Sequence, residues 1–295
     1  MYQYLLYGLI VQSDIPLYNL IQTTGQPSVF ICYGKINYDN LFYDSKDFFY
    51  STDYVCFLTD YGVLAISNGD KIIIEPNSKA NHLNLAAYVL GWGMAFIFTQ
   101  RGYSALHCTA LSINNHGFLI SGISGAGKST TALSLINRGC KFLADDIAML
   151  NPPDSMMIIP AYPIQKVCRN IAETLNPDNL LYINEDRDKY SYYNPTEFCN
   201  TPSTLKTIIS LRCADIPLVQ VEEITGLNKY LRTLECLFLS EIYASVGASN
   251  DDKFRCLKLA EKIKLYIITR PFNSNTIDEI TDLVLHLVSN EWGVN

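Results

Sequence analysis

Residues 122 to 129 form the segment of this chain whose spacing most clearly allows chemistry. They read GISGAGKS and satisfy the pattern G-x-x-x-x-G-K-[S/T]. The glycines permit backbone angles that turn successive N–H groups toward one concave side, where phosphate oxygens can bind. A following helix adds its positive end, the lysine can reach the outer phosphates, and the serine hydroxyl can ligate Mg²⁺. The segment therefore predicts a nucleotide site that uses ATP and Mg²⁺. The residues expected to contact the nucleotide are Gly122, Ser124, Gly125, Ala126, Gly127, Lys128, Ser129 and Thr130.

Two adjacent carboxylates, Asp145 and Asp146, end the apolar run Phe142-Leu-Ala. An acid that ends a strand beside a phosphate loop commonly holds magnesium, and a second acid can accept the proton of an attacking hydroxyl. Neighbours on a strand point to opposite faces, so we expect the two aspartates to have different roles. The alternative is that both cap a turn.

His107 is a third candidate, because it lies in an apolar segment directly ahead of the strand that leads into the loop. A single histidine in such a segment is more often a packed core residue than a functional one. Lys166 and Arg169 follow later in the chain and allow two interpretations, a clamp for phosphate or carboxylate and the solvated face of a helix.

Alternating apolar runs and turn residues predict the elements that must position these side chains. The first 78 residues are rich in short strands, and Pro76-Asn77-Ser78 is the clearest break. We therefore predict an α/β protein with a small strand-rich N-terminal domain, residues 1–78, and a catalytic domain, residues 79–295. Strands are expected at 4–11, 29–33, 54–58, 63–67, 71–75, 104–113, 118–121, 141–150, 207–212, 218–221 and 265–269. Helices are expected at 81–100, 129–137, 227–244, 253–262 and 274–288, and a long loop or lid at 176–204.

Composition excludes several classes of protein. The formal charge is −7, and no basic run is longer than two residues, so no nucleic-acid partner is expected. Nine cysteines without a C-x-x-C pair fit free thiols in a reducing cytoplasm rather than a disulfide framework or a zinc site. The uncharged stretch between Lys79 and Arg101 contains several polar residues and predicts a buried core helix rather than a membrane span.

Forty residues, His107 to Asp146, resemble the catalytic domain of HPr kinase/phosphorylase, a bacterial enzyme that phosphorylates a serine of a phosphocarrier protein: HCTALSINNHGFLISGISGAGKSTTALSLINRGCKFLADD. The resemblance implies the compact P-loop kinase fold shared with phosphoenolpyruvate carboxykinases. It also implies that His107 and Lys128 are active-site residues, that Ser129 binds magnesium, and that Asp146 accepts the proton of the substrate hydroxyl. Asp145 is then expected to support catalysis and, with Ser129, to hold the metal.

The chain departs from that family after the aspartates, where Ile159 to Asn170 lacks its glycine-rich signature. The resemblance therefore does not extend to phosphorolysis or to HPr as the acceptor. The N-terminal part is more similar to kinase homologues encoded with ribosomally made peptides, lasso peptides among them, which share a Tyr-x-x-Tyr-Gly-Leu strand (Tyr4–Leu9) and a Leu-His-x-x-Ala strand (Leu106–Ala110).

The sequence thus favours a cytoplasmic kinase that phosphorylates a serine-type hydroxyl of a peptide or protein. A homo-oligomer is possible, and no membrane partner is expected. Residues 1–78 and the 176–204 segment are expected to recognise the acceptor. Two alternatives stay open: a small-molecule kinase, and a nucleotide-binding regulatory or assembly protein that transfers no phosphate.

Overall fold

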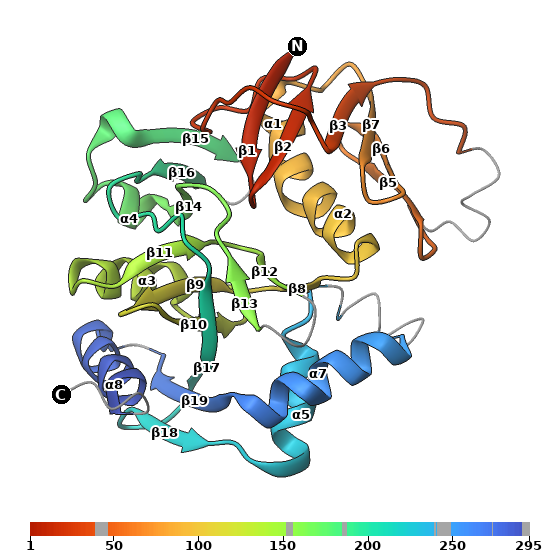
Figure 1. The fold of residues 1–295 in the computed structure, drawn as a ribbon. Helices are drawn as coiled ribbons and strands as arrows, with labels where there is room; N and C mark the ends of the chain where they lie inside the picture. The colour runs from red at the N-terminus through yellow and green to blue at the C-terminus, as the bar shows by residue number, and fades with distance from the viewer. Residues whose placement is uncertain are drawn as a thin grey trace. The chain divides into compact units, whose positions relative to one another are not determined.

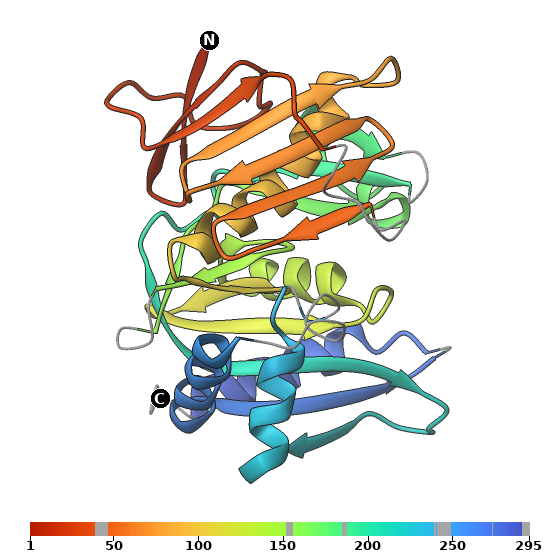
Figure 2. The same cartoon turned by 90° about the vertical axis from the view of Figure 1, so that its right-hand side faces the viewer.

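A computed structural model describes residues 1–38, 47–151, 156–184, 188–238, 240, 249–272 and 274–290. The chain divides into two compact units. The first comprises Met1–Tyr103 with Leu181–Tyr190, and the second comprises Ser104–Leu180 with Ser191–Asn295. Figures 1 and 2 show the ribbon from two sides.

The first unit is built on a seven-stranded sheet of order β1-β2-β3-β7-β6-β5-β4. Its strands are β1 (Tyr2–Leu6), β2 (Leu9–Ser13), β3 (Val29–Tyr33), β4 (Phe48–Tyr50), β5 (Tyr54–Thr59), β6 (Gly62–Ser67) and β7 (Lys71–Pro76). The predicted hairpin is present: β6 and β7 pair antiparallel around Asn68 and Gly69, both of which have positive φ. One strand expected at 4–11 is instead a second hairpin, because Tyr7 (φ 50°) and Gly8 (φ 72°) form a tight turn between β1 and β2.

A continuous helical run follows the sheet: α1 (His82–Tyr88), the π-helical segment η1 (Val89–Gly93) and α2 (Met94–Gln100). By length and composition it could cross a membrane, yet 56% of its apolar window is buried, as expected of a core helix. Phe96 packs against the rings of Phe48 and Phe57, and Phe98 packs against Tyr7. These contacts tie the helix to the N-terminal sheet, so the division between units falls after Tyr103 and not at the expected break near residue 78.

The second unit contains a nine-stranded mixed sheet with the path β11-β9-β10-β17-β13-β12-β8, to which β19 and β18 are added beside β17. Within it, β10, β17 and β19 run parallel. The strands are β8 (Ser104–Leu106), β9 (Thr109–Ile113), β10 (His116–Gly122), β11 (Lys141–Ala144), β12 (Ala148–Leu150), β13 (Met157–Ile159), β17 (Ser203–Ala214), β18 (Gln220–Glu223) and β19 (Lys264–Pro271).

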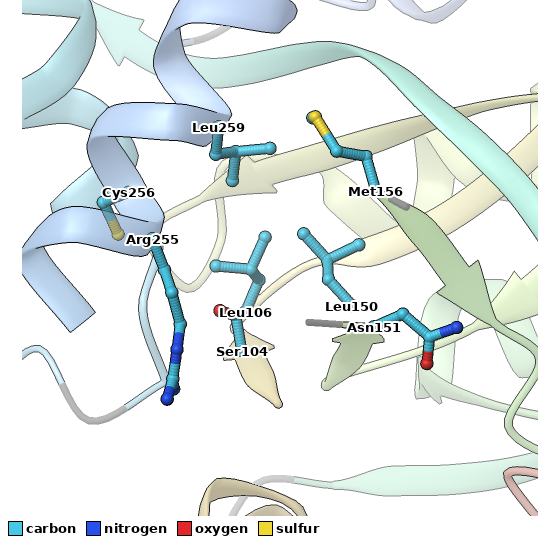
Figure 3. A pocket seen from close by; sticks show the side chains of 8 residues that line it. All are labelled: Ser104, Leu106, Leu150, Asn151, Met156, Arg255, Cys256 and Leu259. Carbon is cyan, nitrogen blue, oxygen red and sulfur yellow. The ribbon is translucent and has the colours of Figure 1, made fainter. Parts of the chain in front are cut away.

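Helices cover this sheet on both faces. Leu135 of α3 (Lys128–Asn137) and Val284 of α8 (Ile277–Asn290) pack with Phe118 and Ile120 of β10 in one buried cluster. On another part of the sheet, α7 (Asn250–Lys262), which packs with α5 (Gly226–Glu235), presents side chains toward β8 and β12 (Figure 3). The pocket between them holds only about 20 Å³, room for about one water molecule. The mixed α/β class with a P-loop core and a strand-rich N-terminal part is therefore confirmed.

The segment expected as a loop or lid is partly ordered structure. It contains the 3₁₀ turn η2 (Pro177–Asn179) and two strands, β15 (Leu180–Asn184) and β16 (Lys189–Tyr193), which form a three-stranded sheet of order β14-β16-β15 with β14 (Ile164–Cys168). A short helix, α4 (Arg169–Ala172), follows β14. The polar and aromatic residues of this segment gave no clear alternation, and their pairing depends on a partner strand elsewhere in the chain. Part of the helix expected at 227–244 lies outside the described residues.

Candidate active site

The glycine-rich loop has the geometry of a phosphate-binding nest. It leaves β10 at Gly122 (φ 141°), passes Gly125 (φ 83°) and Gly127 (φ 107°), and enters α3 at Lys128. All three glycines occupy positive-φ backbone that other residues rarely adopt. Amides of this loop and of the first turn of α3, which includes Ser129, can supply donors for an anion, while the N–H of Ala126 donates to the oxygen of Ile123 (3.1 Å).

Gly122 is also fixed by packing, and this gives a stability prediction. A Cβ at this position would lie 2.5 Å from the backbone oxygen of Leu211, whereas a Cβ at Gly125 would meet nothing within 4 Å. We expect Gly122→Ala to lower the free energy of unfolding by about 3 kcal/mol or more, through strain and the clash with β17. Gly125→Ala is the matched control and should cost only about 1–2 kcal/mol. Urea unfolding of the two variants measures the difference, and equal losses would show that β17 does not hold the start of the loop.

Two cations contact backbone oxygens of the loop. Lys128 Nζ donates to the carbonyl oxygens of Gly122 (2.6 Å) and Ile123 (3.3 Å). Arg270, at the end of β19, donates from Nε to the oxygen of Ala126 (3.2 Å) and from a terminal nitrogen to that of Gly125 (3.4 Å). Sequence analysis missed Arg270, because its relation to the loop depends on the parallel pairing of β10, β17 and β19.

The expected strands 104–113 and 141–150 are each broken where the candidate catalytic residues stand. β8 pairs with β12 through Leu106 and Ala148, and β9 pairs with β11 through Ala110 and Ala144. Both segments therefore change their partner strand, the first at residues 107–108 and the second at residues 145–147. Strand alternation does not apply there, so it was the wrong reason to expect different roles for the two aspartates. The breaks free these side chains from the sheet and bring them together.

Asp145 is held by two hydrogen bonds. Its Oδ1 accepts from the hydroxyl of Thr109 (2.6 Å), and its Oδ2 accepts from the backbone N–H of Lys166 (2.7 Å). Burial raises the pKa of this carboxyl, and the nearby charge of Asp146 raises it further, while the two hydrogen bonds act in the opposite direction. The arrangement suits a residue that ties β9, β14 and the bend after β11 together.

Asp146 is the more accessible carboxylate. It stands at φ 68° in the bend, a conformation that aspartate tolerates better than most residues. Its Oδ2 accepts from Lys166 Nζ at 2.7 Å, and its Oδ1 lies 3.8 Å from His107 Nδ1. The backbone of His107 is fixed by its N–H, which donates to the oxygen of Cys236 (2.8 Å). Lys166 therefore belongs to the cluster, while Arg169 begins α4.

The pKa of His107 depends on several charges, that of Lys128 among them. Desolvation of the ring lowers the pKa of His107, although the side chain is 46% exposed; the charge of Asp146 raises this pKa, and that of Lys128 lowers it again. Contacts thus bring His107, Asp145, Asp146 and Lys166 together, and the charge of Lys128 is among those that act on His107.

The lowered pKa of His107 makes stability depend on pH. The folded state takes up this proton less readily than the unfolded state, so the free energy of unfolding falls as pH drops through about 6.5 toward the lower folded value. We expect His107→Gln to lose less stability than the wild type between about pH 7.5 and about pH 5.5. Urea unfolding at the two pH values measures this, with the exposed His82→Gln as control. If His107→Gln and the wild type lost the same free energy of unfolding between the two pH values, the lowered pKa of His107 would be contradicted.

The oxygen donors present suit magnesium. Among the described residues no group of three or more His, Cys, Asp or Glu side chains gathers as a metal site. A nucleotide-bound Mg²⁺ does not need one, since it takes one or two carboxylates or hydroxyls together with phosphate oxygens. Ser129 in the first turn of α3 and the paired aspartates provide that chemistry.

A groove of about 580 Å³ lies along α3, beginning at Thr130, the residue after Ser129. Its walls come from residues 171–175, from residues 192–197 and from Ile277 at the start of α8. Most of its lining side chains are neutral, and the acidic Glu197 pairs with Lys141 at 2.6 Å. The volume is in the range of ligand-binding clefts, about 300–1,000 Å³.

Comparison with known proteins gives a local similarity. Residues 100–168 match the family model described as the HPr Serine kinase C-terminal domain. HPr kinase/phosphorylase of Bacillus cereus (strain B4264) is 40% identical over 60 residues, which is 20% of this chain and 19% of that protein. The protein of the same name from Bacillus anthracis (strain A0248) matches with the same figures. The chain therefore spans about a fifth of the length of the curated relatives it matches.

A solved structure, the Hpr(Ser) kinase/phosphatase from Coxiella burnetii, aligns with a TM-score of 0.31 and 17% identity over 64% of this chain and 93% of that one. The matched segment 100–168 contains the loop, His107, both aspartates and Lys166. The predicted resemblance to HPr kinase is confirmed over this segment, and the chain is HPr kinase-like there.

Proposed function

We propose that this protein is an ATP- and Mg²⁺-dependent kinase that phosphorylates a serine-type hydroxyl on a peptide or protein. One observation carries the proposal. Asp146 lies between His107 and Lys166, in a cluster where the lysine of the phosphate loop also acts on His107. This arrangement supports a site in which a base, cations and an anion-binding loop act together, as in-line phosphoryl transfer requires.

Each residue of the site has its own role in phosphoryl transfer. Amides of the loop and Lys128 stabilise the charge on the moving phosphoryl group. The acceptor oxygen bonds to the terminal phosphorus while the bond to the ADP oxygen breaks, and the hydroxyl proton passes to Asp146. Lys166 and His107 orient this carboxylate, and Asp145 anchors the bend that presents it. Ser129, assisted by Asp145, would hold Mg²⁺, which neutralises phosphate charge when bound.

A peptide or protein acceptor is supported by the groove along α3. It is mostly neutral, open and continuous with the first turn of α3, so it suits an extended chain better than a small charged metabolite. Tyr192 and Asn194 in its wall belong to the segment expected to contact the acceptor. A role for residues 1–78 in acceptor recognition, and a ribosomal precursor peptide as the acceptor, rest on the N-terminal motifs alone. A cytoplasmic location fits the free cysteines.

The test is transfer of label from γ-labelled ATP. Purified protein with Mg²⁺ is incubated with serine-containing peptides, including precursor peptides encoded beside its gene, and with free serine. Label on a peptide serine supports the proposal. Label on free serine alone would make the protein a small-molecule kinase, and nucleotide binding without any transfer would favour a regulatory protein.

A further inference from the structure

The order of strands places the end of β19 on one side of the phosphate loop. The phosphate loop follows β10, whose neighbours are β9 on one side and β17, then β19, on the other. The aspartates follow β11, which lies beyond β9. Arg270 at the end of β19 contacts the loop, so a nucleotide whose terminal phosphate faces Asp146 can direct its nucleoside toward β17 and β19. The carboxyl ends of these parallel strands lie at the same sheet edge as the loop, where ligands of such sheets bind.

Arg270 brings the end of β19 against the outer side of the loop. Its guanidinium donates to the oxygens of Gly125, Ala126 and Pro271. A Cβ built on Gly127 would lie 3.7 Å from Arg270 Nε. Because the carbonyls of Gly125 and Ala126 are held by this side chain, their peptide units are fixed. Arg270 is therefore a positioning residue for the amides of the loop.

Phe272 follows directly after the end of β19 and is 60% exposed. A single exposed aromatic residue needs no explanation by itself. This one stands two residues beyond the arginine that contacts the loop. Aromatic rings stack on nucleobases without depending on the base's hydrogen-bonding pattern.

We infer that the end of β19 is the nucleoside side of the site, with Phe272 as the stacking platform for the base and Arg270 as the clamp on the phosphate loop. This inference rests on the proposed nucleotide-dependent function. It separates two contributions to affinity: Phe272 acts only on ligands that carry a base, whereas Arg270 acts on every ligand that carries phosphates.

Isothermal titration of ADP and of inorganic tripolyphosphate, each with Mg²⁺, tests the inference. Phe272→Ala should weaken ADP binding about tenfold, which corresponds to about 1.4 kcal/mol, and should leave tripolyphosphate binding unchanged. Arg270→Ala should weaken both ligands. Phe254→Ala, another exposed phenylalanine (55%) of the same unit, is the control and should change neither.

A second readout uses Phe272→Trp, whose fluorescence should be quenched by ADP and not by tripolyphosphate. Unchanged ADP affinity in Phe272→Ala, or equal loss for both ligands, would overturn the stacking assignment while leaving the phosphate site intact. If neither ligand bound the wild-type protein, the proposed function would fail as well.

Discussion

Asp146→Asn should bind ATP with nearly the affinity of the wild type and lose phosphoryl transfer by about 10²–10⁴-fold, the range for removal of a positioned general base. An amide oxygen cannot take up the proton of the acceptor hydroxyl at neutral pH. The carboxylate is partly exposed and its partners include Lys166 and His107, so the substitution should leave the fold intact. Single-turnover transfer and titration of ATP measure the two quantities separately.

Asp251→Asn, an exposed aspartate in the first turn of α7, is the matched control and should change neither quantity. Full transfer activity in Asp146→Asn would mean that another group, or none, takes the proton. An equal loss of ATP affinity and of transfer would give Asp146 a role in binding rather than in proton transfer.

Lys128→Met is the second substitution with a large expected effect. It should weaken ATP binding as well as phosphoryl transfer. A charge-assisted hydrogen bond to phosphate contributes about 1.5–3 kcal/mol, so ATP affinity should fall about 10- to 100-fold. Lys128 contacts backbone oxygens of the loop at its start, and methionine preserves the length of the side chain, so the loop and α3 should remain folded.

Titration with ATP and with tripolyphosphate should show the same loss for Lys128→Met, because the lysine acts on phosphates. Lys253→Met, at an exposed position of α7, is the control. If Lys128→Met bound ATP with wild-type affinity, the lysine would not contact the phosphates. The proposal that the loop binds phosphate would then lose its main support.

The sequence predicted the local parts of the site well, because glycine spacing and helix propensity act over a few residues. The loop and the helix from Lys128 to Asn137 are present as expected. The break at His107 was not predicted, whereas a turn at Asp145–Asp146 was only the alternative interpretation, because each break arises where the strand exchanges partners. A glycine or proline would have signalled them, and neither segment contains one.

Contacts between distant segments also could not be predicted from the sequence. Lys166 allowed two interpretations, and only its pairing with Asp146 favours the site. The contact of Arg270 with the phosphate loop could not be recognised from the sequence, since an arginine near the end of a strand is common. The helical run 82–100 was correctly expected to be buried, but its packing against the N-terminal sheet depends on rings such as Phe48 and Phe57 that precede it in the chain.

A crystal structure with Mg²⁺ and a non-hydrolysable ATP analogue tests the central claim most directly. The account predicts phosphate oxygens within hydrogen-bonding distance of the amides from Gly125 to Ser129, with the carboxylate of Asp146 facing the terminal phosphate. A nucleotide bound elsewhere, or an Asp146 directed away from the terminal phosphate, would contradict it.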